Sequence, residues 1–135
     1  MDQLEPGIPE CPDYLDDIGR REWARVSKLL LSMRVITEAD YIALGSLCQS
    51  YSTMIQAQRQ LSKTGLLIQT KTGYPIQNPL LSIIAQERNV INKLICEFGL
   101  TPASRTRVNM IIEEKKAVNK FAFLHEVAPI QDPVQ

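Results

Sequence analysis

The sequence is poor in histidine and has no nucleotide-binding loop. His125 is the only histidine in 135 residues and falls in the predicted tail, so neither a site of several histidine ligands nor a Ser-His relay has support. No GxxxxGK[ST] loop is present that would hold a nucleoside triphosphate. Neighbouring acids such as Glu113 and Glu114 are typical of a solvated helix face. We therefore expect no enzymatic activity, no metal ion and no cofactor.

Cysteine is also scarce. Cys11, Cys48 and Cys96 are odd in number and widely spaced, which argues against a disulfide framework and against a zinc knuckle. Cys48 and Cys96 fall within apolar stripes of helical period, where a free thiol behaves as a small hydrophobic side chain. We expect these thiols to be structural.

Long apolar runs are missing as well. No stretch approaches the roughly 20 apolar residues that a membrane-spanning helix needs. The first twelve residues are acidic and contain three prolines, which is unlike a signal peptide. The sequence thus predicts a soluble, intracellular protein without a membrane partner.

Charge is balanced overall but unevenly distributed. The formal net charge is zero, so the whole chain has no field that favours nucleic acid. Residues 1–22 carry seven acids against two arginines, whereas residues 99–120 carry five cations against two glutamates. A chain that is acidic at the front and basic near the back can bind different partners at its two ends, or pair with copies of itself.

The apolar periodicity predicts two helices in the first half of the chain. The first starts at a cap on Asp13 and runs for about 20 residues, with Trp23 on its buried face. Thr37-Glu38-Ala39-Asp40 is a capping box with aspartate in the last place, and it starts a long helix that ends at Gly65. The expected core face of the first helix consists of Leu15, Ile18, Trp23, Val26, Leu29, Leu30 and Met33.

Residues 66–77 change to a period of two around Thr72-Gly73, which predicts a β-hairpin. A hairpin of two strands is barely stable alone, so it must lean on helices or on another subunit. Asn78-Pro79 then caps a helix over 79–98, Gly99 ends it, and a last helix is expected from Pro102 to about Lys116.

These elements predict a mainly α fold, with about four helices and a short β-hairpin between the second and the third. We expect an extended acidic arm over 1–12, a helical domain for oligomerisation and DNA recognition over 13–117, and a tail over 118–135 that contains His125.

Nucleic-acid binding is the leading chemical possibility, because of the local group of cations near the end of the chain. The candidate phosphate contacts are Arg105, Arg107, Lys115, Lys116 and Lys120. The amides at Thr101–Ser104, where the last helix starts, would add an anion site. The alternative is that these cations only solvate the end of a helix. A DNA site on the first helix, at Arg20, Arg21, Arg25 and Lys28, is a further possibility.

The order of several motifs resembles the small terminase subunits of tailed bacteriophages over about residues 9–110. The motifs are Trp23, Thr37-Glu38-Ala39-Asp40, Tyr51, Gly65, Gly73, Asn78-Pro79 and Gly99-Leu100-Thr101-Pro102-Ala103-Ser104-Arg105. Their combination at these distances is distinctive, although each motif alone is common in helical proteins.

The resemblance implies a non-catalytic component of viral genome packaging. Such a subunit forms a ring-like homo-oligomer in the host cytoplasm, binds double-stranded viral DNA, and recruits and regulates the large subunit, which carries the ATPase and the nuclease. Two other readings stay open: a small helix-turn-helix transcription regulator, and a purely structural oligomeric adaptor.

Overall fold

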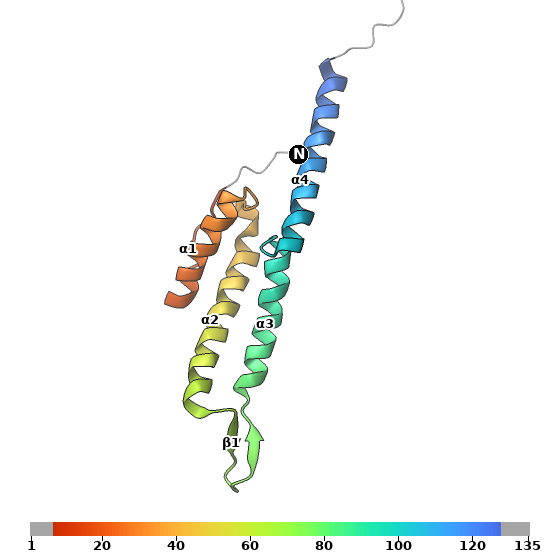
Figure 1. The fold of residues 1–135 in the computed structure, drawn as a ribbon. Coiled ribbons are helices and arrows are strands. Elements are labelled where there is room, and N and C mark those ends of the chain that lie inside the picture. Colours follow the sequence, from red (N-terminus) through yellow and green to blue (C-terminus); the bar gives the residue numbers. More distant parts are fainter. Residues whose placement is uncertain (1–6, 128–135) are drawn as a thin grey trace, which may run out of the picture. The chain divides into compact units, whose positions relative to one another are not determined.

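The computed structural model describes residues 7–127, and side chains for residues 7–122 (Figure 1). The chain divides into two compact units, with the boundary after Phe98. The first unit contains α1 (Asp17–Ser32), a short 3₁₀ turn (Glu38–Asp40), α2 (Tyr41–Thr64), β1 (Leu67–Gln69), β2 (Pro75–Gln77) and α3 (Leu80–Glu97). The second unit contains α4 (Pro102–Val127).

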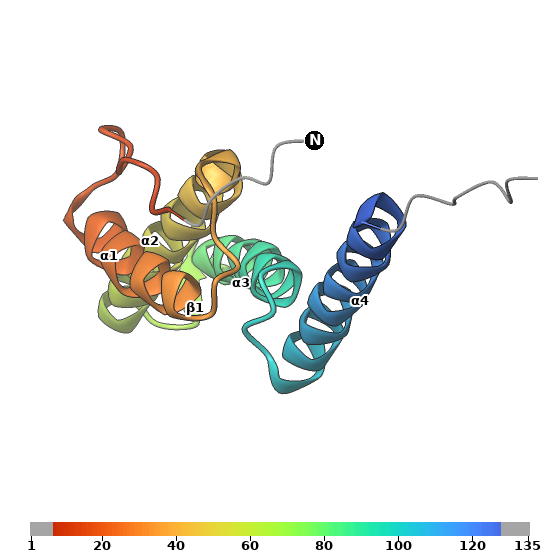
Figure 2. The ribbon, with the colours of Figure 1, turned by 90° about the horizontal axis from the view of Figure 1, so that it is seen from above.

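The prediction of a mainly helical fold with a small β-hairpin is confirmed, but the helix count of the packed core needs correction. Three helices, rather than four, form the first unit, where α2 packs against both α1 and α3 (Figures 1 and 2). Helix α4 belongs to the other unit. Its apolar residues lie on more than one side of the helix, so no single stripe directs it into a shared core.

The core of the first unit is formed by the apolar stripes that the periodicity predicted. From α1 it takes Trp23, Val26 and Leu30, from α2 Leu44, Leu47 and Cys48, and from α3 Ile84 and Ile91. Trp23 makes an edge-to-face contact with Tyr41, with ring centroids 6.1 Å apart, so it is a core residue as expected. Leu29 was also expected in the core, but it is 42% exposed.

Helix α1 begins later than the sequence predicted, because its N-cap is Asp16 rather than Asp13. The Asp16 carboxylate accepts a hydrogen bond from the Gly19 amide at 2.8 Å. It also accepts bonds from Ser52, at 2.6 Å, and from Gln56, which both lie on α2. These donors are 36 and 40 residues away in the sequence, so local pattern could not single out Asp16. The cap therefore also ties α1 to α2.

The start and end of α2 follow the predicted signals. The Thr37 amide donates to the Asp40 carboxylate at 2.8 Å, so the capping box is confirmed. Gly65 ends the helix with φ of 86°, and its amide donates to the Leu61 carbonyl at 2.7 Å. Glycine adopts this combination of φ and a ψ of 172° readily, whereas residues with a side chain do not.

The hairpin is confirmed, with Ile68 opposite Ile76 in an antiparallel pair. Asn78 closes its base and is only 4% exposed. Its amide nitrogen Nδ2 donates to Thr64 Oγ1 at 2.8 Å and to the Gly65 carbonyl at 2.9 Å, while its Oδ1 accepts from the Leu80 amide. One side chain thus joins the end of α2 to the start of α3.

Helix α4 is longer than predicted. It continues through Lys116 to Val127, because no glycine or proline interrupts the sequence before Pro129. The backbone of His125, which was expected in a tail, is therefore helical. The rest of the predicted tail, residues 128–135, lies outside the described residues. Residues 1–6, the first half of the predicted acidic arm, also lie outside them.

We predict that Asn78→Ala lowers the free energy of unfolding by about 2–4 kcal/mol, because it removes three hydrogen bonds at a buried position. Chemical denaturation followed by circular dichroism measures the change. The matched control is Asn89→Ala, an exposed asparagine within α3, which should cost under about 1 kcal/mol. Equal losses in the two variants would contradict the proposed role of Asn78.

A second prediction concerns acid stability. Hydrogen bonds, first from Ser52 and then from Gly19, lower the pKa of Asp16 below its usual 3.8. A carboxyl with a lowered folded-state pKa stabilises the fold above its unfolded pKa, and this contribution is lost as the pH falls through the folded pKa. Ser52→Ala should therefore reduce stability at pH 6, and its difference from wild type should shrink below pH of about 4. Denaturation curves between pH 2.5 and 7 test this, and a difference that stays constant over that range would refute it.

Candidate nucleic-acid interface

The five predicted DNA-contacting residues all lie on α4, and all are exposed. The residues around the N-terminus of α4 determine where this helix begins. Gly99 has φ of 72°, and a Cβ there would come within 2.9 Å of Val108, so glycine fits both the backbone and the space. Thr101 and Ser104 then cap α4 reciprocally: the Thr101 amide donates to Ser104 Oγ, and the Ser104 amide donates to Thr101 Oγ1.

This cap corrects one expectation. The amides at Thr101–Ser104 were expected to form an anion site, but two of them are already used within the cap. A third position is proline, which has no N–H group. The start of α4 is therefore a closed capping motif, with too few available donors for a phosphate.

Helical geometry places four of the five cations within an arc of about 140° around the axis of α4. At about 100° per residue, Arg105, Lys116 and Lys120 lie within roughly 60° of one another around the axis. Lys115 lies about 80° from Arg105, on the side toward Arg107, and Arg107 lies about 160° from Arg105. We call Arg105, Lys115, Lys116 and Lys120 the basic face of α4.

The two glutamates of α4 divide between these sides. Glu113 lies at the edge of the basic face, one turn before Lys116, and Glu114 lies on the side of Arg107. The basic face therefore keeps a net charge of +3, from four cations and one acid. The side that carries Arg107 is neutral in sum.

The structure shows a second group of cations that only partly overlaps the alternative site on α1. Arg21 and Arg25 of α1 and Arg59 of α2 line a hollow of about 310 Å³, which Tyr51 also lines. Hydrogen bonding to Glu22 raises the pKa of the Arg25 guanidinium above its usual value. The sequence did not predict Arg59 as part of this group, because only the packing of α2 against α1 brings it beside Arg21 and Arg25.

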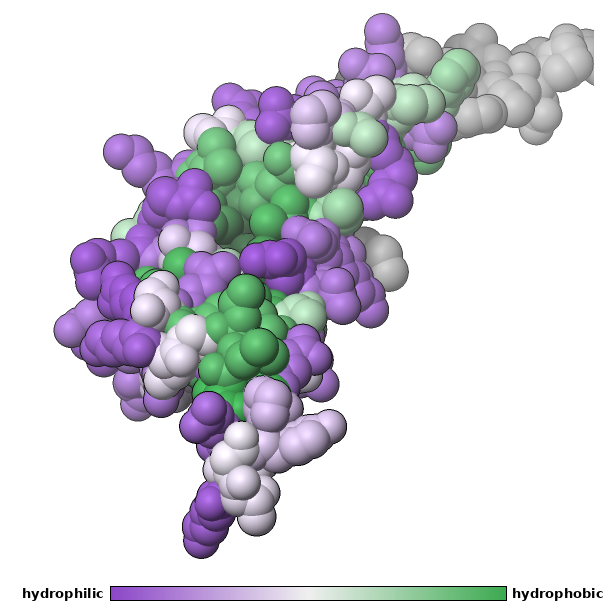
Figure 3. All heavy atoms as spheres, turned by 60° about the horizontal axis from the view of Figure 1, so that its bottom comes forward, coloured by the Kyte–Doolittle hydropathy of each residue, from purple (hydrophilic) through white to green (hydrophobic). Residues whose placement is uncertain are grey.

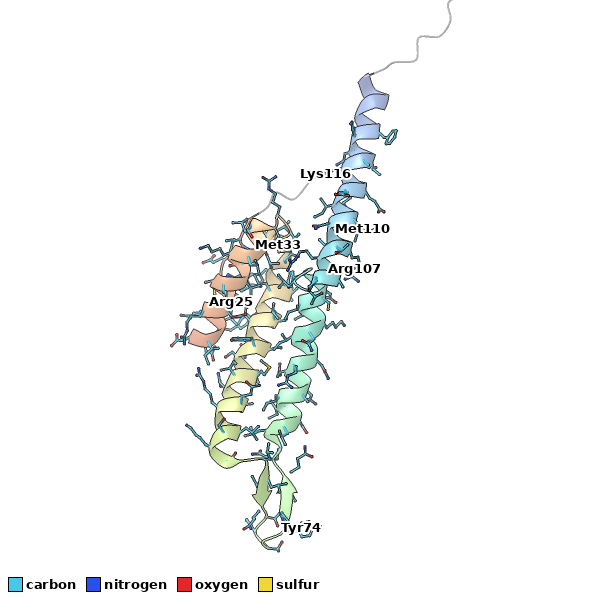
Figure 4. All side chains as sticks on the ribbon, viewed as in Figure 1. Arg25, Met33, Tyr74, Arg107, Met110 and Lys116 are labelled. Atoms are coloured by element: carbon cyan, nitrogen blue, oxygen red, sulfur yellow. The ribbon has the colours of Figure 1, made fainter. Side chains whose placement is uncertain are left out.

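The hairpin is an apolar element without cover in the described chain. Leu67 is 66% exposed and Tyr74 is 69% exposed, and Leu66 and Ile76 also reach solvent. Figure 3, in which the end that carries the hairpin comes forward, shows hydrophobic atoms gathered at this surface. Tyr74 lies at the far tip, near the turn (Figure 4). We expected the hairpin to pack on helices or on another subunit. In the described chain, these four side chains stay exposed.

The cysteines differ from one another. Cys48 is fully buried, as expected, and burial raises the pKa of its thiol to about 12, so the thiolate is not available as a nucleophile at neutral pH. Cys96 was also expected in an apolar stripe, but it is exposed.

Neither a metal-binding cluster nor a membrane-spanning helix is found in the described part of the chain. Within residues 7–122, no three His, Cys, Asp or Glu side chains are grouped so that they would hold a metal ion. In the part of the chain that the structure describes, no helix combines the length and the apolar character needed to cross a membrane.

Comparison with known families identifies the chain. The model of the family described as phage terminase, small subunit, matches residues 19–115, which is well over half of the sequence. The chain belongs to the phage terminase small-subunit family. No curated protein and no solved structure matches it significantly.

As a small terminase subunit, the chain has a role in phage genome packaging. The matched segment runs from α1 through the hairpin into α4. It therefore includes Asn78, whose hydrogen bonds clamp the end of α2 to the start of α3, and the cap of α4. It includes Arg105, Arg107 and Lys115 but ends before Lys116 and Lys120. Two cations of the basic face thus lie beyond the part that defines the family.

Proposed function

We propose that this small terminase subunit binds double-stranded viral DNA through the basic face of α4 and does so as a homo-oligomeric ring. The observation that carries the proposal is the convergence of Arg105, Lys115, Lys116 and Lys120 on one side of an exposed helix. Each cation that neutralises a phosphate releases a counterion, so four such contacts per subunit give salt-sensitive binding.

Oligomerisation would turn a modest patch into a strong one. One basic face has a net charge of +3, but symmetry repeats that face in every subunit and sums the fields. The exposed hairpin is the part of the chain that most needs a partner, because an uncovered pair of strands is marginally stable in water. We assign it to the contact between subunits.

The subunit would be non-catalytic and would act in the host cytoplasm beside the large subunit, which supplies ATPase and nuclease activities in packaging. Recruitment of that large subunit is part of the proposal. The length of α2, at about 36 Å for 24 residues, suits a scaffold that holds such partners.

The helix-turn-helix regulator is a weaker alternative. Its second helix would have to be a compact recognition helix, whereas α2 has 24 residues and follows the acids Glu38 and Asp40. No specific observation favours it over the packaging role.

The first test addresses DNA. Replacing Arg105, Lys115, Lys116 and Lys120 with alanine should weaken binding to a 30-base-pair duplex and flatten the plot of log K against log salt by up to about 3–4. Arg107→Ala is the matched control on the opposite side of the helix, and it should change the slope by less than about 1. Fluorescence anisotropy at several salt concentrations measures both. An unchanged slope in the fourfold variant would move the DNA site off α4.

The second test addresses assembly. Light scattering at micromolar concentration should give a particle mass that is a multiple of the 15.3 kDa chain. Leu67→Asp with Tyr74→Asp should lower that mass, because two charges would be buried at the contact. Gln86→Asp with Asn89→Asp, at exposed positions of α3, adds the same two charges outside the hairpin and should leave the mass unchanged. A strictly monomeric wild-type chain would contradict the proposed ring.

A further inference from the structure

The hollow between α1 and α2 has the features of a binding site that the packaging role does not explain. Its volume is about 310 Å³, near the lower end of the range for ligand pockets and enough for one large side chain. Three arginines line it, and all three are exposed, so they form its rim. Ile18 and Ile55 also line it and are half-buried, so they lie deeper. The site therefore combines a cationic rim with an apolar interior.

The arginines are held in different ways. Arg25 donates from Nε to Glu22 Oε2 at 3.1 Å, and its Nη2 also bonds to that carboxylate. Glu22 is 8% exposed, whereas the Arg25 side chain is 66% exposed, so a buried acid fixes a guanidinium that still faces solvent. Arg21 donates from Nε to the Asp17 carbonyl at 3.2 Å, which lays its stem along α1.

Charge around the hollow favours an anion. Glu22 compensates one guanidinium, which leaves a net charge of about +2 from Arg21 and Arg59. Among the described residues, no hydrogen bond or ion pair holds the side chain of Arg59. Guanidinium groups are weakly hydrated and present paired donors, so they suit a carboxylate or a phosphate.

The apolar interior decides between these anions. A DNA backbone offers phosphates and sugars but no large apolar group to enter between Ile18 and Ile55. A duplex would also bring a row of phosphates toward the acids Asp13, Asp16 and Asp17 at the start of α1, which would repel them. A peptide places a carboxylate and an apolar side chain next to each other and needs only a small footprint.

We propose that this hollow binds a short segment of a partner protein in which Asp or Glu stands beside a large apolar side chain. The apolar side chain enters between Ile18 and Ile55, and the carboxylates pair with Arg21 and Arg59 on the rim. Arg25, held by Glu22, adds a preorganised donor. This site is separate from the basic face of α4 and does not depend on DNA binding there.

The test uses a displayed library of random 12-residue peptides, panned on the full chain. The selected peptides should share one or two acids beside Phe, Leu, Ile or Trp. A synthetic, labelled copy should then bind in anisotropy measurements, and changing its acids to amides, or its apolar residue to glycine, should weaken binding at least about tenfold.

The protein variants locate the site. Arg21→Gln with Arg59→Gln should lower the affinity for the selected peptide at least about tenfold and leave the affinity for DNA unchanged. Lys63→Gln, which removes a cation one turn beyond Arg59, should change neither. Both arginines are exposed, so the double variant should keep the wild-type melting temperature.

Three results would overturn the proposal. The library could yield no acidic-apolar consensus on wild type, or peptides could bind the double variant as well as wild type. The double variant could also lose DNA affinity while no peptide is selected, in which case the hollow contacts DNA. These outcomes are independent of the fourfold variant of α4, so failure here is distinct from failure of the packaging role.

Discussion

The first unit depends on the way in which Asn78 holds its two long helices together at one end. The backbone amide of Asn78 donates to the Leu66 carbonyl at 2.9 Å, and its side chain bonds to Thr64, Gly65 and Leu80. The side chain is buried, so an unmade bond would cost the full desolvation of a polar group. This requirement fixes where the chain leaves α2, where it enters α3, and therefore how the apolar stripes of the two helices face each other.

The same clamp holds the hairpin away from the core. The strands emerge beyond the ends of the two helices, and most of their side chains are exposed. Exposed apolar strands with unpaired edges are normally covered or blunted in proteins that work alone. The hairpin thus links the local hydrogen bonds of Asn78 to the assembly that we propose for this terminase subunit.

Two groups of cations have different origins. The basic face of α4 follows from sequence spacing alone, because residues 105, 116 and 120 recur at nearly whole turns of a helix. The rim of the hollow requires two helices, since Arg21 and Arg59 meet only through the packing of α1 on α2. The first group suits a ligand with many phosphates, and the second suits a small anion beside an apolar group. The two proposals thus assign different partners to different surfaces of this subunit.

The sequence by itself determined the elements whose signals are local. The capping box at Thr37, the glycine stops at Gly65 and Gly99, and the hairpin turn at Gly73 each depend on residues within about five positions, so pattern was sufficient. The tertiary structure decided what depends on distant partners. It moved the cap of α1 to Asp16, because Ser52 and Gln56 donate to that carboxylate, and it placed Arg59 beside α1. It also divided the chain after Phe98, so that α4 belongs to a unit of its own.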